Sequence, residues 1–294
     1  MSFRVTESTQ LASAQRNLQL SAQRLNQLDE QVASGLAISK PSDDPAGAAT
    51  LLDLQRQLAQ NTQYQRNAGD GNAWLATAGT ALTSMNDTLN QVRDLTVQAA
   101  NTATQTPSSR AAIATQLQSL KQSLMTLANT QYQGRSVFAG TSDTGSAFNP
   151  DYSFNGTAGS SVNRRVGTDT TVRVDVDGSS VLGAGPTSVF ALIDSIASTV
   201  SSGGNVGGQL TAIDAVAANI RGAEATVGSA QNQLTGATSA LTTQATTLQT
   251  TQNGIQNVDA ASAILEMQTQ QVAYQTALAV TAKSIQPTLM DYLR

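Results

Sequence analysis

Apolar residues recur every seven positions through the C-terminal third of the chain, without a break. The repeat runs through Ile213, Ile220, Val227, Leu234, Leu241, Leu248 and Ile255. A second series stands three residues after each of these positions, from Val216 to Val258, and several of its members are alanines. Paired series of this kind form the seam of a coiled coil, and small residues in the seam let a neighbouring helix come close. The pattern therefore predicts one long helix packed against another.

The two ends of the chain carry shorter seams. Their apolar positions are Leu11, Leu18, Leu25, Leu28 and Val32 at the N-terminal end, and Ile264, Met267, Tyr274, Leu278 and Ile285 at the C-terminal end. Helical spacing also marks residues 75–99, and Pro107 favours the first turn of another helix. Packing between helices is enough to explain each of these apolar series, without any other function. Because the terminal seams need partners, we predict that they pair with each other and carry the contacts between subunits.

Polar residues interrupt both terminal seams, namely Ser21, Gln271 and Thr281. Isolated helices with so few apolar contacts are marginal in water, so we expect about 40 residues at each end to be poorly ordered in the monomer and to fold on assembly. Hydrogen exchange on dilute monomer tests this expectation. Strong protection of residues 1–35 and 262–294 would contradict it.

The middle of the chain has a different character. Residues 140–161 are rich in turn-forming residues, and Val172, Val174 and Val176 alternate with charged residues between Thr170 and Gly178. Alternation with period two predicts a half-buried strand, and Asp177–Gly178 is typical of a hairpin turn. We therefore predict a mainly α fold, a long coiled-coil-like helical bundle formed by the N- and C-terminal segments, with a small β module inserted at residues 140–186.

The stretch GLAISKPSDDPAG, residues 35–47, separates the N-terminal seam from the next helical segment. Its adjacent acids suit either a metal site or a helix N-cap, and it lacks the residue order of a phosphate-binding loop. With Asp44 as N-cap, Pro45 takes the first helical position, which proline favours. We interpret the stretch as a joint between a terminal helix and the body, formed by Gly35, Pro41, Asp43, Asp44 and Pro45.

Composition narrows the candidate chemistry. The chain has no cysteine and no histidine, which removes thiolate metal sites and the commonest general base. A net charge of -4 provides no basic surface for nucleic acid, and no apolar run is long enough for a membrane span or a secretory signal. We predict no catalytic site, no metal and no cofactor, although a serine–lysine pair is not excluded. Charged residues make up only 12% of the chain and none occurs between Ala225 and Val258, so the polar surface there is uncharged.

Two terminal motifs resemble the bacterial flagellin family. One is VASGLAISKPSDDPAGAATLLDLQRQL, residues 32–58, and the other is AVTAKSIQPTLMDYLR, residues 279–294. Within that family, the short chain, QGRSVFAGTSDT at residues 133–144 and the DYLR ending are similar to the members that join the flagellar hook to the filament. The MSFRVTES start departs from the family by carrying extra residues before the usual short apolar opening.

The resemblance implies an assembly and a set of partners. The helices at 3–34 and 259–294 would form an inner tube, those at 46–135 and 187–255 a surrounding shell, and the β module would face outward. The expected segments are therefore 1–40, 41–139, 140–186, 187–256 and 257–294. The resemblance also implies export through the flagellar type III apparatus without a cleaved signal, to the extracellular flagellum. The implied partners are copies of the same chain in a ring-like homo-oligomer, hook-associated protein 1, flagellin and a cytoplasmic flagellar export chaperone.

Three other functions remain open at this point. The chain would instead be a flagellin filament subunit if it forms long polymers by itself. A coiled-coil adhesin or effector that uses the same export apparatus would carry a receptor-binding β module and would be dispensable for swimming. An enzyme is the remaining alternative, and no convergent set of polar residues favours it.

Overall fold

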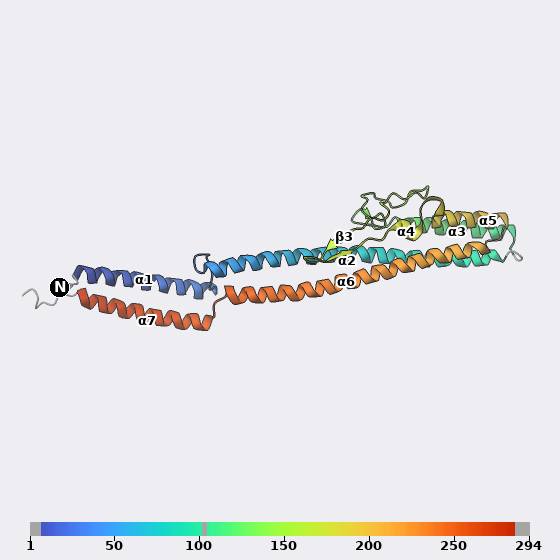
Figure 1. Cartoon of the computed structure of the whole chain (residues 1–294). Coiled ribbons are helices and arrows are strands. Elements are labelled where there is room, and N and C mark those ends of the chain that lie inside the picture. The colour runs from blue at the N-terminus through green and yellow to red at the C-terminus, as the bar shows by residue number, and fades with distance from the viewer. Residues whose placement is uncertain (1–6, 102–104, 286–294) are drawn as a thin grey trace, which may run out of the picture. The chain divides into compact units, whose positions relative to one another are not determined.

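The computed structural model describes residues 7–101 and 105–285, and it is mainly α-helical with four short strands among those residues (Figure 1). The helices are α1 (Glu7–Ser34), α2 (Pro45–Ala100), α3 (Pro107–Ala128), α4 (Gly178–Leu182), α5 (Val189–Ser202), α6 (Leu210–Gln256) and α7 (Ala260–Ile285). The strands are β1 (Gln131–Tyr132), β2 (Arg135–Ser136), β3 (Asn163–Arg165) and β4 (Thr171–Arg173). The predicted fold class, long helices with a small β insertion, is confirmed.

The chain divides into two compact units. A terminal unit comprises residues 1–59 and 245–294, and a central unit comprises residues 60–244. Helices α2 and α6 each contribute to both units. In the terminal unit, α1 and α7 lie side by side and run in opposite directions (Figure 1).

In the central unit, α2 and α6 form an antiparallel pair. All members of the predicted repeat from Ile213 to Leu241 are buried in α6, together with Ala217 and Ala230, and the terminal unit continues the series with buried Leu248 and half-buried Ile255. In the central unit, residues of α2 with the same seven-residue spacing are buried too, and these are Asn61, Ala68, Leu75, Leu82, Leu89 and Thr96. Asn61 hydrogen-bonds to the carbonyl of Leu241 across the pair, so the two repeats form one packed seam within this unit.

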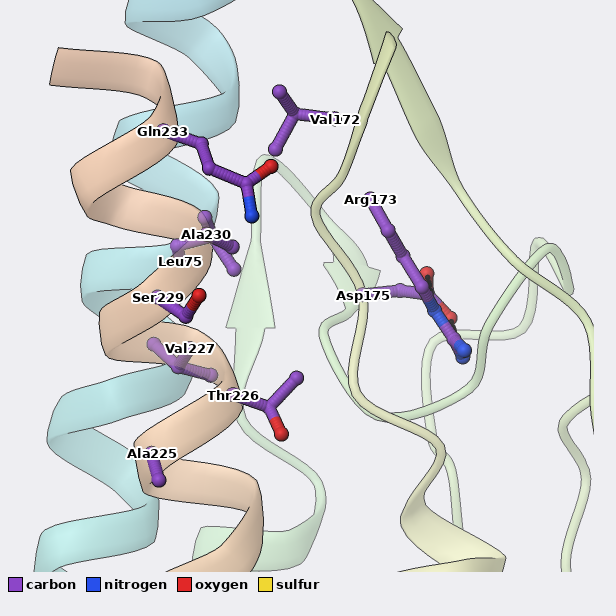
Figure 2. A pocket seen from close by; sticks show the side chains of 10 residues that line it. All are labelled: Leu75, Val172, Arg173, Asp175, Ala225, Thr226, Val227, Ser229, Ala230 and Gln233. Atoms are coloured by element: carbon purple, nitrogen blue, oxygen red, sulfur yellow. Dashed lines mark hydrogen bonds and ion pairs between the residues drawn. The ribbon is translucent and has the colours of Figure 1, made fainter. Parts of the chain in front are cut away.

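The inserted β region packs on this helix pair. Strands β3 and β4 form an antiparallel hairpin, and Arg164 on β3 makes an ion pair of 2.8 Å with Asp70 on α2. A groove runs between β4 and α6, and its lining is mostly small or apolar (Figure 2). Arg173 and Asp175 lie at its edge and pair with each other at 2.9 Å, so the charged groups of the groove satisfy one another.

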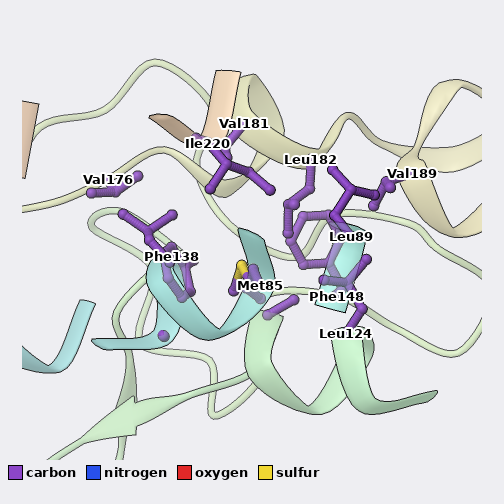
Figure 3. Close-up of a cluster of buried hydrophobic side chains, with 14 of the residues drawn as sticks. Met85, Leu89, Leu124, Phe138, Phe148, Val176, Val181, Leu182, Val189 and Ile220 are labelled. Carbon is purple, nitrogen blue, oxygen red and sulfur yellow. The ribbon is translucent and has the colours of Figure 1, made fainter. Parts of the chain in front are cut away.

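Three phenylalanines centre the core of the central unit, where the loops of the β region meet α2, α3 and α5. Phe148 contacts Phe190 edge to face, with ring centroids 5.4 Å apart, and Phe138 is also fully buried. Met85, Leu89 and Leu124 surround them (Figure 3). Each such side chain contributes roughly 1.5–3 kcal/mol when buried. The β region therefore shares its core with the helices.

The structure corrects the prediction for residues 170–178. Strand β4 ends at Arg173, and Asp177 begins a helix: its carboxylate accepts hydrogen bonds from the backbone N–H groups of Ser179 (2.9 Å) and Gly159 (2.8 Å). Asp177 and Gly178 therefore form the N-cap and first residue of α4. The prediction of a hairpin turn there was wrong, because aspartate before glycine suits both a turn and a helix cap, and the partner Gly159 is distant in sequence.

A second hairpin, β1–β2, precedes the region that the sequence pattern marked as β. Its turn residues, Gln133 and Gly134, have φ of 50° and 79°. Two successive positive φ values are the signature of the type I′ turn that suits two-residue hairpins. The hairpin places Tyr132 edge to face against Trp74, with centroids 5.8 Å apart. Trp74, the lone tryptophan, is thus a buried packing residue of α2 against the β region.

Candidate assembly interface of the terminal helices

Helices α1 and α7 contact each other through a narrow, mixed face. Leu28 on α1 is 1% exposed and Ala263 on α7 is 4% exposed. Between α1 and α7, the side-chain amide of Gln270 donates to the hydroxyl of Ser21 at 2.9 Å, and Arg24 pairs with Glu266 at 2.6 Å. The ion pair is about half exposed on both sides, so it adds little stability. Few apolar groups hold this helix pair.

The predicted seam residues occupy several environments. On α1, Leu28 is buried and Leu18, Leu25 and Val32 are half-buried. On α7, Met267 and Tyr274 are half-buried, whereas Ile264 and Leu278 are exposed by 40% and 43%. Leu11 and Ile285 lie within α1 and α7, but their side chains fall outside the described residues.

The face of α7 that contacts α1 is rotated from the face that the sequence pattern suggested. Its less exposed residues are Ala263, Met267, Gln270, Tyr274, Ala277 and Thr281, which alternate spacings of four and three. This face includes Ala263, Gln270 and Ala277 in place of the predicted Ile264, Gln271 and Leu278. Apolar spacing could not identify it, because polar Gln270 finds its partner only across the helix pair.

The opposite face of α7 presents apolar side chains to solvent. Leu265, Val272 and Val280 are 66%, 63% and 63% exposed. Leu265 and Val272 are seven residues apart and therefore share one side of the helix. Val280 lies about 80° around the helix from Val272, so we call Leu265 and Val272 the outer face of α7. Exposed apolar residues gathered on one face mark an interaction surface.

The predicted joint residues shape the connection between α1 and α2. Gly35 has φ of 71°, and its N–H donates to the carbonyl of Gln31 at 2.9 Å, which ends α1. The carboxylate of Asp44 accepts from the N–H of Ala46 at 3.0 Å, and α2 begins at Pro45. The N-cap prediction for Asp44 and Pro45 is confirmed.

Asp43 folds the same connection on itself, beside Pro41 in an exposed turn. Its carboxylate accepts hydrogen bonds from the backbone N–H groups of Lys40 (2.9 Å) and Ser39 (3.1 Å). The hydrogen bond from the Lys40 N–H holds the pKa of Asp43 below its usual range. Both acids are therefore engaged with backbone N–H groups. Within the described residues, no group of three or more carboxylates is placed to hold a metal ion.

A second connection lies between α6 and α7, where the apolar repeat showed no break and the family resemblance implied separate helices at 187–255 and 259–294. The backbone N–H of Ala37 donates to the carbonyl of Gln256 (2.8 Å), and that of Val258 donates to Gly35 (3.0 Å). Asp259 then caps α7 by accepting from the N–H of Ala261 at 3.0 Å. A signal was present, because aspartate before Ala-Ala-Ser is a common helix start. The apolar repeat continues through Ile255 and Val258 and conceals the break.

Comparison with known proteins identifies the family. The model of the bacterial flagellin N-terminal helical region matches residues 6–143, and that of the flagellin C-terminal helical region matches residues 210–293. Together the two matches cover well over half of the chain. The chain belongs to the bacterial flagellin family. It is accordingly a helical structural protein of the flagellum, which is an extracellular organelle.

Relatives within the flagellin family include both filament and hook-associated proteins. The chain is 28% identical to a flagellin of Bacillus subtilis over 275 residues, which cover 87% of this chain and 88% of that protein. It is 33% identical to flagellar hook-associated protein 3 of Salmonella typhimurium over 114 residues, 38% of this chain and 36% of that protein.

Solved structures of the flagellin family share the fold. The structure of a putative flagellar hook-associated protein from Vibrio parahaemolyticus matches with a TM-score of 0.68 and 26% identity, over 73% of this chain and all of that one. The FlgL protein of Bacillus cereus matches with a TM-score of 0.60 and 23% identity, over 68% of this chain and 99% of that one.

No helix among the described residues of this flagellin-family chain is long and apolar enough to span a membrane.

Proposed function

We propose that this chain is the hook–filament junction protein, hook-associated protein 3, of a bacterial flagellum. The observation that carries the proposal is the match to the Vibrio parahaemolyticus hook-associated protein, which extends over all of that chain. The short β region agrees with it. In the segment QGRSVFAGTSDT, Arg135 pairs with Asp143 at 2.9 Å while Val137 and Phe138 are buried, so the motif forms part of the core.

The outer face of α7 supplies a mechanism for assembly. Helix α1 leaves Leu265 and Val272 exposed, and burying each of them against a neighbouring subunit would contribute roughly 1–2 kcal/mol. The polar surface nearby is mostly Gln, Thr and Ser, which can be buried in hydrogen-bonded contacts without desolvating a full charge. Copies of the chain would therefore pack through their terminal helices into a ring.

The proposed role implies a set of partner proteins. The ring would contact hook-associated protein 1 on the hook side and flagellin on the filament side. Before export, a cytoplasmic flagellar chaperone would hold the C-terminal helical region. Export would use the flagellar type III apparatus without a cleaved signal. The function that we propose is structural, with no substrate and no cofactor.

Deletion of the gene tests the junction role. We expect cells that still build hooks, do not swim and release flagellin into the medium, because filament subunits would have no junction on which to polymerise. Restoring the full chain on a plasmid is the control and should return swimming. Cells that lack the chain and still carry normal filaments would contradict the proposal.

A filament subunit is the second candidate, and the Bacillus subtilis flagellin favours it because the match spans nearly nine-tenths of both chains. Purified protein separates the two roles. A flagellin would elongate into micrometre-long filaments from seeds under filament-forming conditions, whereas a junction protein would stop at short assemblies. Electron microscopy of seeded samples, with an authentic flagellin as the positive control, provides the measurement.

A further inference from the structure

The connections that flank α1 and α7 are bonded to each other. In the terminal unit, residues 35–44 link α1 to α2 and residues 257–259 link α6 to α7. Leu36 and Asn257 form an isolated antiparallel bridge, and the N–H groups of Ala37 and Val258 donate across it at 2.8 and 3.0 Å. We call residues 35–38 and 256–258 the clasp.

Local contacts specify the shape of the clasp on its α1 side. The side-chain amide of Gln31, in the last turn of α1, donates to the carbonyl of Ala37 at 3.0 Å. Lys40 reaches back to the carboxylate of Glu30, also in α1, at 2.9 Å. These contacts tie the loop to the end of α1, so movement of the loop would move the helix end.

Gly47 closes the clasp on its α2 side. A Cβ atom at this position would lie 2.5 Å from Cδ1 of Ile38 and 2.5 Å from Oδ2 of Asp44. Ile38 is half-buried, and it occupies the space that a side chain in the first turn of α2 would fill. Gly47 lies in a helix without a positive φ, so an effect of substitution there would be steric: a side chain at residue 47 would have to displace the ends of the Ile38 and Asp44 side chains from their places beside α2.

The seam between α1 and α7 does not by itself fix how the two helices align. Among the described residues, its buried apolar side chains are Leu28 and Ala263, so little apolar burial resists a shift of one helix along the other. The clasp supplies the missing constraint. The helices are antiparallel and start from the hydrogen bond between Gly35 and Val258. Positions earlier in α1 therefore lie beside positions later in α7, and this register pairs Arg24 with Glu266 and Ser21 with Gln270.

We propose that the clasp, closed by Ile38 on Gly47, sets the register in which α1 pairs with α7. Gly47 and Ile38 are thus positioning residues for the terminal helix pair. The inference concerns the fold of the terminal unit and holds whichever flagellar role the chain has.

Two measurements on the full chain test the proposal. Hydrogen exchange at the amides of Ala37 and Val258 reports whether the clasp is closed. Because the chain has no native cysteine, oxidation of an introduced S21C/Q270C pair in dilute protein reports the register, and a S21C/A277C pair reports a slip by one heptad, about 10.5 Å along the helix.

In G47A we expect protection of both amides to be lost and S21C/Q270C oxidation to fall about tenfold relative to S21C/A277C, because disulfide formation requires close and specific geometry. The matched control is G69A, in the same helix, where a Cβ would meet nothing within 4 Å and both readouts should remain unchanged. The double variant I38A/G47A removes the steric conflict with Ile38 and should restore both readouts at least in part.

Other outcomes would overturn the proposal. In G47A, unchanged protection would show that Ile38 does not close the clasp, and lost protection with unchanged cross-linking would show that the clasp does not set register. Emission of the sole tryptophan, Trp74, reports whether the central unit stays folded. If G47A disrupts folding, the double variant I38A/G47A provides the test. Recovery of both the amide protection and the S21C/Q270C cross-link supports the proposal, and a variant in which one of them does not recover contradicts it.

Discussion

Asn61 is a polar residue within an apolar seam. It is 3% exposed, its side-chain amide donates to the carbonyl of Leu241 at 3.0 Å, and its Oδ1 atom has no hydrogen-bond partner. Gln244 lies beside it, with its Oε1 3.3 Å from Nδ2 of Asn61. A buried asparagine in a coiled-coil seam costs stability and distinguishes the correct helix partner from incorrect ones.

Replacement of Asn61 by leucine should therefore stabilise the chain. We expect the free energy of unfolding to rise by about 1 kcal/mol, because an unsatisfied acceptor is removed and apolar contacts with Leu241 replace it. Urea denaturation followed by circular dichroism measures the change. Asn61→Asp is the matched comparison and should destabilise by burying a charge. A leucine variant less stable than the wild type would contradict this account of the seam.

A second polar cluster joins α3, α5 and the β region. Lys121 on α3 pairs with Asp194 on α5 at 2.6 Å and donates to the hydroxyl of Tyr152 at 2.9 Å. Burial raises the pKa of Asp194, but hydrogen bonds from Lys121, Tyr152 and Gln118 outweigh burial and leave that pKa below its usual range. Burial likewise lowers the pKa of Lys121, and its hydrogen bonds to Asp194 and Tyr152 outweigh that effect and raise it.

The signs of these shifts define a pH window. A lowered carboxylate pKa contributes stability that is present above the unfolded value, about 3.9, and is lost as pH falls below it. A raised lysine pKa contributes stability that is present below about 10.4 and is lost as pH rises above it. We expect the difference in unfolding free energy between wild type and Asp194→Asn to be largest from about pH 5 to 9. Urea titrations at pH 3 and 7 measure it, and an equal difference at both would contradict the assignment.

The principal surface element is the outer face of α7. This face points away from α1 and is exposed to solvent. A charge there should leave the monomer fold intact, because surface substitutions change the free energy of unfolding by about 0.5 kcal/mol or less. In an assembly the same charge would be buried without a partner. The two states of the chain should therefore respond differently to one substitution.

Val272→Asp should accordingly abolish assembly and leave the monomer folded. We expect affinity between subunits to fall at least about a hundredfold, because an unpaired buried carboxylate costs several kcal/mol. Sedimentation of purified protein and swimming of the complemented strain provide the readouts. Val272→Ile keeps the surface apolar and serves as the matched control. Normal assembly of the aspartate variant would place the interface elsewhere.

Helices with a regular apolar repeat or a recognisable first turn could be predicted from the sequence. The repeat of α6, the proline at the start of α3 and the Asp44–Pro45 start of α2 were all predicted and are present. Elements that depend on a distant partner did not follow. Asp177 caps α4 with help from Gly159, and α7 turns Gln270 toward Ser21. Local pattern cannot identify such contacts, because the residues that satisfy them are not neighbours in the chain.

At the scale of the whole molecule, the central unit contains its own core. All members of the main buried cluster lie between Ala68 and Leu234, and the central unit spans residues 60–244. The terminal unit relies on Leu28, Leu51, Leu54, Leu248 and Ala263 for its buried apolar groups. This difference in core size predicts different independent stability.

A chain of residues 60–244 should fold without the terminal unit. We expect it to keep the Trp74 emission of the full chain and to unfold in a single cooperative transition, because the core cluster is intact. A chain of residues 60–200, which lacks α6, is the comparison and should not fold, since it loses Ile213, Ile220 and Leu234 from the core. An unfolded 60–244 chain would show that the terminal unit is needed for the core. The expectation that the chain ends order only on assembly stays a prediction.

The sequence by itself determined what periodicity and composition encode: a helical chain with a long coiled-coil seam, a β insertion, a proline-bounded joint and an uncharged surface suited to burial. Seven-residue spacing and helix caps act over a few residues, so they can be read locally. Only the tertiary structure decided the partners: the clasp between the two connections, the match of Asn61 with Leu241 and Gln244, and the face that α7 leaves exposed. Each of these joins residues far apart in sequence, and a hydrogen bond or a steric fit exists only once the chain has brought both sides together.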